Sequence, residues 1–125
     1  MYDPKTNTPL LVPAACPVPD RPQGAPALFG KLKIEVIPNS VAFSIYKRTE
    51  IEERFACSYE LNLAFRGNIE GAGMLITGFG EVGEARIVEL PKNRFYMATL
   101  YQPHMTSEPG KPHPLITAYL RAAIG

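Results

Sequence analysis

The prolines of this chain are concentrated at its beginning. Of the 13 prolines in 125 residues, seven fall within the first 26 positions. Proline lacks a backbone N–H and has a fixed φ, so it is excluded from helix interiors and from central strands. Residues 1–28 are therefore predicted to form an extended, Pro-rich arm, in which only the apolar residues 10–12 favour a short strand. Regular structure is expected in residues 29–125.

Length and charge exclude several classes of protein. A chain of 125 residues is the size of one domain. Its 13 Lys+Arg balance 12 Asp+Glu, so no nucleic-acid partner is expected. No apolar run approaches the roughly 18 residues of a membrane span, so no membrane partner is expected either. Two cysteines are too few for a disulfide scaffold, and we find no signal peptide, which together predict a cytoplasmic protein.

The segments after the arm are rich in strand patterns. Residues 31–36 alternate strictly between apolar and charged, which is typical of a half-buried strand. The alternation at Val41, Phe43 and Ile45 predicts a second strand, a charged connector follows over residues 47–53, and residues 54–60 predict a third. Further strands are expected at 74–79 and 85–90, joined by a turn through Gly80 and Gly83. The apolar run 95–101 predicts a strand covered on both faces.

Two segments favour helices. Asn62 is a good N-cap for residues 63–72, where apolar residues recur at helical spacing. Pro114 suits a first helical turn, and an apolar stripe follows it as far as Gly125. The pattern Gly78-x-Gly80-x-x-Gly83 resembles a dinucleotide-binding loop, but it opens no helix, so we predict no such cofactor.

Few side chains favour chemistry on their own. His104 follows a predicted buried strand, where a general base could stand, whereas His113 is expected to cap or flank the last helix. Cys57 is predicted to be a buried, inert thiol, with a reactive thiol at Cys57 or Cys16 as the alternative. Cysteines and histidines lack the spacing of a zinc site, so we predict no metal and no cofactor. Glu50, Glu52 and Glu53 are interpreted as a solvated charge run.

The order of several short motifs resembles a known family. These motifs are Ile51-Glu52-Glu53-Arg54, Tyr59-Glu60-Leu61-Asn62, Ile69-Glu70-Gly71-Ala72-Gly73, Ile87-Val88-Glu89-Leu90-Pro91 and His113-Pro114-Leu115. Over residues 29–123 the chain resembles the C-terminal half of the class I glutamine amidotransferase domain of CTP synthase. The resemblance implies the α/β class: the β-rich C-terminal portion of a flavodoxin-like, three-layer amidotransferase fold, with a mixed sheet and two helices.

The chain departs from this family where the chemistry should be. In the family, a cysteine attacks glutamine, a histidine activates the cysteine, and a glutamate orients the histidine. The histidine and glutamate belong to a motif aromatic-His-Pro-Glu, which here reads Tyr101-Gln102-Pro103-His104. Gln102 thus stands in place of the base, and His104 in place of the carboxylate. Ser58 replaces an arginine that helps to hold the substrate, beside Tyr59, and the cysteine elbow is expected upstream of Met1.

These departures predict a diverged, non-catalytic amidotransferase-like domain, related to CTP synthase and to pyrimidine nucleotide biosynthesis. Its pocket near Ser58, Tyr59, Gln102 and His104 is expected to bind a small polar ligand. The alternatives are an active amidotransferase or hydrolase fragment with an upstream cysteine, or a thiol redox protein. A half-domain leaves sheet edges uncovered, so we expect a homo-oligomer or association with a separate N-terminal half.

Overall fold

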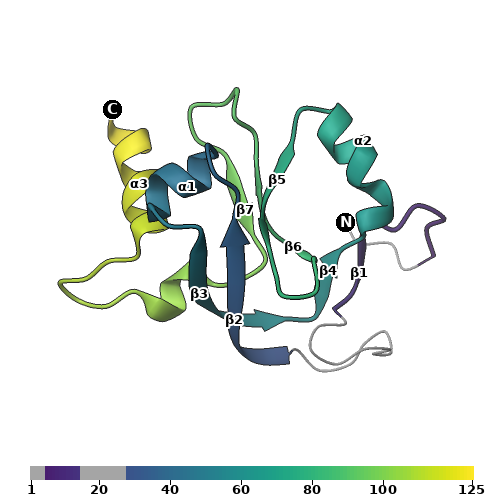
Figure 1. The fold of residues 1–125 in the computed structure, drawn as a ribbon, viewed down its shortest axis with the longest axis horizontal. Coiled ribbons are helices and arrows are strands. Elements are labelled where there is room, and N and C mark those ends of the chain that lie inside the picture. Colours follow the sequence, from purple (N-terminus) through teal and green to yellow (C-terminus); the bar gives the residue numbers. More distant parts are fainter. Residues whose placement is uncertain (1–4, 15–27) are drawn as a thin grey trace.

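A computed structural model describes residues 5–14 and 28–125 (Figure 1). Its main sheet has five strands in the order β3-β2-β5-β6-β7, and a separate pair joins β1 to β4. Every pairing of these strands is antiparallel, so no parallel pair of the expected mixed sheet occurs in the described residues. The strands are β1 (Leu11–Pro13), β2 (Leu28–Val36), β3 (Glu50–Cys57), β4 (Tyr59–Leu61), β5 (Leu75–Phe79), β6 (Ala85–Glu89) and β7 (Met97–Thr99).

The pair β2–β3 forms the longest ladder of the sheet. Ile34 lies opposite Ile51, and their side chains enter the core with Val36 and Phe55. The strand predicted at residues 31–36 is confirmed, and it begins earlier, at Leu28. The prediction of a connector as far as residue 53 was wrong, because β3 already begins at Glu50 and its buried residues alternate from there.

The strand predicted around Val41 was wrong, because residues Val41–Tyr46 form helix α1. Asn39, with a φ of 65°, turns the chain, and the Ser40 hydroxyl accepts a hydrogen bond from the Phe43 N–H at 3.0 Å. The buried carboxylate of Glu89 accepts from the N–H groups of Val41 and Ala42, at 2.9 and 3.1 Å. The first N–H groups of a helix have no partner within the helix, and these bonds provide one. A contact with a distant strand therefore stabilises a helix in a segment whose alternating pattern favoured a strand.

The helices lie in two places in Figure 1. Helix α1 and helix α3 (Pro114–Ile124) lie together on one side, and α2 (Arg66–Gly71) lies at the other end beside β5. The helix predicted from residue 63 is confirmed in place, but its first turn is the 3₁₀ helix η1 (Leu63–Phe65), capped by Asn62. The described residues thus form three α-helices rather than the two expected. Of the apolar stripe on α3, only Leu115 is buried.

The last strand is shorter than predicted. β7 occupies residues Met97–Thr99 of the run 95–101 and pairs on one side with β6. Within residues 5–14 and 28–125 no strand pairs with its other side. Ala98 is exposed, so one face of the strand is not covered there, and the expectation of cover on both faces was wrong. The chain continues into the 3₁₀ helix η2 (Pro103–Thr106). No helix in the described part of the chain has the length and apolar character needed to cross a bilayer.

Candidate functional site

The segment that follows β7 carries the residues that depart from the amidotransferase motif. The Gln102 N–H donates to the Arg54 carbonyl at 3.1 Å. Its side-chain Oε1 accepts from the Ala56 N–H at 2.6 Å, and its Nε2 donates to the Ala56 carbonyl at 3.2 Å. The carboxamide thus pairs with both backbone groups of Ala56, as a neighbouring peptide would. Gln102 thus occupies the outer edge of β3 at Arg54 and Ala56.

Cys57 lies beside this bridge. Its side chain is buried, its Sγ donates to the Leu100 carbonyl at 3.4 Å, and Gln102 Nε2 lies 3.9 Å from the same sulfur. The prediction of a buried thiol is confirmed. Cys16, the other candidate thiol, lies outside the described residues.

The remaining predicted site residues are more scattered. His104 is exposed on η2, and its ring has no hydrogen-bond partner in residues 5–14 and 28–125. The Ser58 carbonyl accepts from the Ala14 N–H, and the half-buried Tyr59 lies in β4 opposite Pro13. The common pocket of Ser58, Tyr59, Gln102 and His104 stays a prediction.

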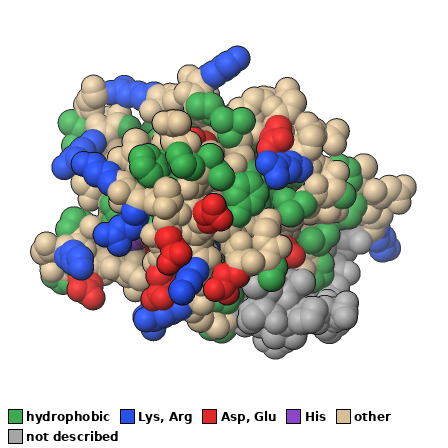
Figure 2. Space-filling model, viewed as in Figure 1, with side chains coloured by type: hydrophobic (Ala, Val, Ile, Leu, Met, Phe, Trp, Pro, Cys, Tyr) green, Lys and Arg blue, Asp and Glu red, His purple; other side chains and the backbone are tan. Residues whose placement is uncertain are grey.

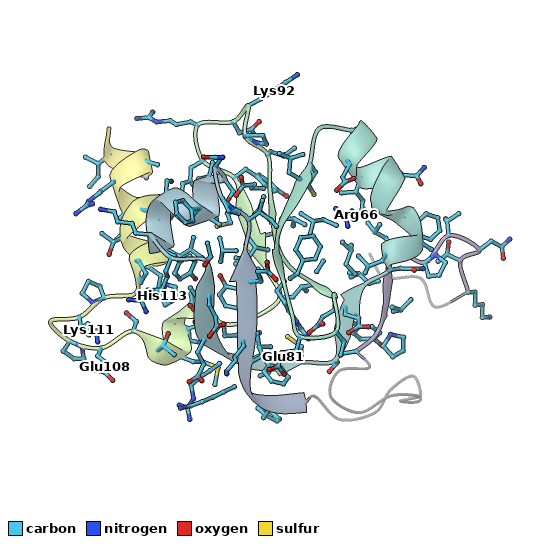
Figure 3. The ribbon with its side chains drawn as sticks, in the orientation of Figure 1. Arg66, Glu81, Lys92, Glu108, Lys111 and His113 are labelled. Carbon is cyan, nitrogen blue, oxygen red and sulfur yellow. The ribbon has the colours of Figure 1, made fainter. Side chains whose placement is uncertain are left out.

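A cavity that the sequence did not predict opens next to η2. Its volume is about 370 Å³, and it lies between α1, β3 and the loop before α3. Charged side chains of both signs line it, and on the face shown in Figure 2 such side chains are intermixed rather than separated by sign. His113, at the base of α3, lines it too (Figure 3). The lining includes Tyr46, Arg48, Glu53, Thr106, Lys111 and His113.

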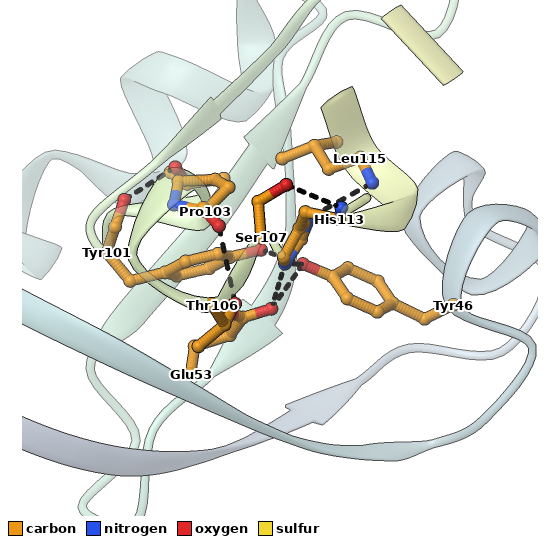
Figure 4. A network of polar contacts seen from close by, with 9 residues as sticks. Tyr46, Glu53, Tyr101, Pro103, Thr106, Ser107, His113 and Leu115 are labelled. Atoms are coloured by element: carbon orange, nitrogen blue, oxygen red, sulfur yellow. Dashed lines mark hydrogen bonds and ion pairs between the residues drawn. The ribbon is translucent and has the colours of Figure 1, made fainter. Parts of the chain in front are cut away.

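A buried polar cluster of Tyr46, Glu53, Tyr101 and His113 lies against this cavity (Figure 4). The Glu53 Oε1 accepts from the Tyr46 hydroxyl at 2.9 Å and lies 2.5 Å from His113 Nε2. The hydroxyls of Tyr46 and Tyr101 are 2.7 Å apart. Glu53 is 3% exposed, so the interpretation of this residue as part of a solvated charge run was wrong.

The donors in the cluster can be assigned from chemistry. His113 Nδ1 accepts from the Leu115 N–H at 3.1 Å, so the proton of the neutral ring is on Nε2 and is donated to Glu53. A carboxylate only accepts, so the single proton of Tyr46 also goes to Glu53, and Tyr101 must donate to Tyr46. Both ring nitrogens of His113 are thus occupied. His113 caps α3 as predicted, and it links α3 to β3 through Glu53.

Burial changes the acidity of both tyrosines. Desolvation raises the pKa of Tyr46 far above its ordinary 10.0, and Tyr101 and the negative charge of Glu53 act in the same direction. Desolvation also raises the pKa of Tyr101, although its hydrogen bond with Tyr46 acts against the rise. The two hydroxyls therefore remain protonated across the physiological range.

Comparison with known proteins identifies the relatives of this fold. No family model matches the chain. The CTP synthase of Nostoc punctiforme is 36% identical over 126 residues, which cover 98% of this chain, and that of Microcystis aeruginosa is 40% identical over 88 residues, or 70% of this chain. The structure of the Trypanosoma brucei CTPS glutaminase domain with bound acivicin superposes with a TM-score of 0.85 at 25% identity, covering 96% of this chain.

The chain is a relative of CTP synthase. It matches the C-terminal glutaminase part, and its resemblance to the class I amidotransferase fold is confirmed. The chain spans only 23% of the length of the Nostoc protein and 47% of the Trypanosoma chain.

Within this CTP synthase-related fold, the described residues hold no group of three His, Cys, Asp or Glu side chains suited to a metal ion. The glycine pattern of residues 78–83 spans the end of β5 and the turn into β6, and it opens no helix, as predicted.

Sequence reasoning missed the link between Glu53 and His113. Its signal was a glutamate at an apolar position of an alternating strand, between Ile51 and Phe55.

Proposed function

We propose that this chain is a diverged, non-catalytic glutamine amidotransferase-like domain related to CTP synthase, with a binding or regulatory role in pyrimidine nucleotide synthesis. The observation that carries the proposal is the pairing of the Gln102 carboxamide with the Ala56 backbone. A general base needs a titratable lone pair within reach of the nucleophile. A carboxamide has no such group, and this one is occupied by structural hydrogen bonds.

Two further features support the loss of glutaminase chemistry. His104, which stands in place of the orienting carboxylate, is exposed, and within the described residues nothing positions its ring. Cys57 is the thiol beside Gln102 in the described part of the chain, but its Sγ is turned to a backbone carbonyl in the core. A nucleophile must reach the substrate, and a buried structural thiol does not.

The role that remains is recognition. We propose a small polar ligand near Ser58, Tyr59, Gln102 and His104, and a polypeptide partner that completes the sheet. The free thiol of Cys57 suits a reducing compartment, so we place the protein in the cytoplasm.

The test is ammonia release from glutamine by the purified 125-residue chain, with a cysteine-alkylated sample as the control. We expect no release above that control. Release that alkylation abolishes would establish an active amidotransferase and overturn the proposal. Intact-mass measurement after incubation with acivicin, the compound bound in the Trypanosoma structure, is the second readout, and we expect an unchanged mass.

A double variant tests the assignment of the motif. Gln102→His with His104→Glu restores the residue pair that the family resemblance implies. We still expect no ammonia release, because Cys57 remains buried against Leu100. Activity in the double variant would show that a usable nucleophile is already in place and that only the base had been lost.

A further inference from the structure

Two neighbouring cavities share a wall beside η2. The cavity of about 370 Å³ between α1, β3 and the loop before α3 has a neighbour of about 270 Å³, which is lined by Lys31 and Arg54. Glu52, Glu53 and Thr106 line both cavities. At this shared wall, a small molecule in either cavity would meet the buried polar cluster.

The two carboxylate oxygens of Glu53 are unequally engaged. Oε1 receives the hydroxyl proton of Tyr46 and the Nε2 proton of His113. Among the hydrogen bonds of the described residues, Oε2 accepts one, from the Thr106 hydroxyl at 3.4 Å, and that hydroxyl also lies 3.3 Å from the Pro103 carbonyl. Hydrogen bonds from hydroxyls are usually about 2.5–3.0 Å long, and one proton cannot serve two acceptors fully. Oε2 therefore keeps acceptor capacity at the shared wall.

A buried carboxylate with spare acceptor capacity favours a cation. Glu53 is 3% exposed, and taking its charge out of water is costly unless hydrogen-bond donors replace the water. A donor that carries a positive charge compensates better than a neutral one. An ammonium group is compact and has three N–H donors. The base of the cavity, at Glu53, therefore suits a primary ammonium group.

The rim of the larger cavity carries the opposite charge. Arg48 and Lys111 line it, and both are exposed. The carboxylate of Glu52 lies 3.4 Å from Lys31 Nζ, so it is paired toward the smaller cavity. Lys111 lies farther out along the loop than His113 (Figure 3). The charge of the larger cavity thus changes from negative at its base to positive at its rim.

Local structure fixes the backbone of both rim residues. Arg48 follows Lys47, which ends α1 with a φ of 59° and donates its N–H to the Phe43 carbonyl at 2.7 Å. Lys111 exchanges two backbone hydrogen bonds with Glu108, at 2.9 and 3.1 Å. An anion at the rim therefore has to order two side chains but no backbone, which lowers the entropic cost of binding.

We propose that the larger cavity binds a small zwitterion that carries a primary ammonium group and a carboxylate. The ammonium group donates to Glu53 Oε2 in place of the Thr106 hydroxyl. The carboxylate lies between Arg48 and Lys111, where a guanidinium can pair with it through two parallel hydrogen bonds. These residues differ from those of the pocket predicted around Gln102, so the two binding proposals can fail separately.

The test is titration of the ¹⁵N-labelled chain near neutral pH and at constant ionic strength, followed by ¹H–¹⁵N correlation spectra. The probes are glycine, 4-aminobutyrate and 6-aminohexanoate, whose two charges are increasingly far apart, with butylamine and butyrate as single-charge controls. We expect at least one zwitterion to bind with a Kd of about 1–10 mM and to shift the amide signals of Thr106, Lys111 and His113. The single-charge controls should bind about fivefold more weakly or worse.

Two results of this titration would overturn the proposal. Butylamine or butyrate that binds as tightly as the best zwitterion would show that a single charge accounts for the site. Amide signals of Thr106, Lys111 and His113 that show no saturable shift up to about 50 mM of any zwitterion would show that the cavity takes none of them.

Substitutions at the rim test the place of the carboxylate. Arg48→Gln and Lys111→Gln should each weaken zwitterion binding about threefold or more. Lys92→Gln, at an exposed position between β6 and β7, is the matched control and should bind as the parent does. Unchanged affinity in both rim variants would refute the proposed orientation.

Substitutions at the base test the place of the ammonium group. Glu53→Gln should abolish zwitterion binding, but it also removes a charge that the polar cluster depends on, so Thr106→Val is measured beside it. Valine has a shape similar to threonine and offers no proton to Oε2, so binding should tighten about twofold or more. Weaker binding by Thr106→Val, or parental affinity in a folded Glu53→Gln, would contradict the role of Glu53.

Discussion

The hydroxyl of Tyr46 is the central link of the buried polar cluster, and removing it should cost far more than removing that of Tyr101. Tyr101→Phe removes one neutral donor and leaves the bond from Tyr46 to Glu53 in place, so the loss is about 1 kcal/mol. Tyr46→Phe removes a bond to a carboxylate, about 1.5–3 kcal/mol, and leaves the buried Tyr101 hydroxyl without an acceptor, about 1–3 kcal/mol more. The double variant leaves no such orphan, so it should cost about 2 kcal/mol less than the sum of the single variants.

The assay is urea unfolding near neutral pH, followed by circular dichroism, for all four members of the cycle. A total stability of about 5–15 kcal/mol makes these differences measurable. Tyr119→Phe is the control, because Tyr119 is 56% exposed, and it should stay within about 0.5 kcal/mol of the parent. Additive costs, or equal costs for the two single variants, would refute the assigned order of donors.

Three other predictions follow from contacts in the core and at the edge of β3. Folding raises the pKa of Tyr46 and of Tyr101, so as the pH rises the unfolded chain loses these protons at a lower pH than the folded chain does. The free energy of unfolding should therefore fall above pH 10.0, by about 1.4 kcal/mol per pH unit for each tyrosine. Urea unfolding at several pH values measures this decline, which should be smaller in Tyr46→Phe and Tyr101→Phe. Gln102→Ala should destabilise the fold by about 2 kcal/mol and speed hydrogen exchange at the Ala56 N–H, whereas the same measurements on His104→Ala should match the parent. Cys57 should react with a water-soluble disulfide reagent only on unfolding, and rapid modification of the native chain at this residue would contradict its packing.

The sequence predicted those parts of the fold in which local pattern and tertiary contact agree. The alternation in β2, the Asn62 cap and the Pro114 helix start are local signals, and each was confirmed. Helix α1 was missed because its first N–H groups are satisfied by Glu89, 48 residues away from Val41. A local sequence pattern spans far fewer residues than this separation, so it cannot reveal the contact.

The candidate site was predictable only in part, for a similar reason. The motif around residue 102 identified which residues to inspect, but not that the carboxamide would pair with Ala56. Glu53 was taken for a surface charge because two exposed glutamates precede it on the chain, Glu50 and Glu52. Its burial depends on His113, which lies 60 residues later.

The bridge from Gln102 to Ala56 also constrains how position 102 can change. A carboxamide presents an acceptor and a donor side by side, which matches the N–H and C=O of one residue, whereas the two nitrogens of an imidazole diverge. A histidine at this position would leave the N–H or the C=O of Ala56 without its present hydrogen-bond partner. Replacement of Gln102 by histidine should therefore lower the stability of the fold, because one imidazole cannot satisfy the N–H and the C=O of Ala56 together.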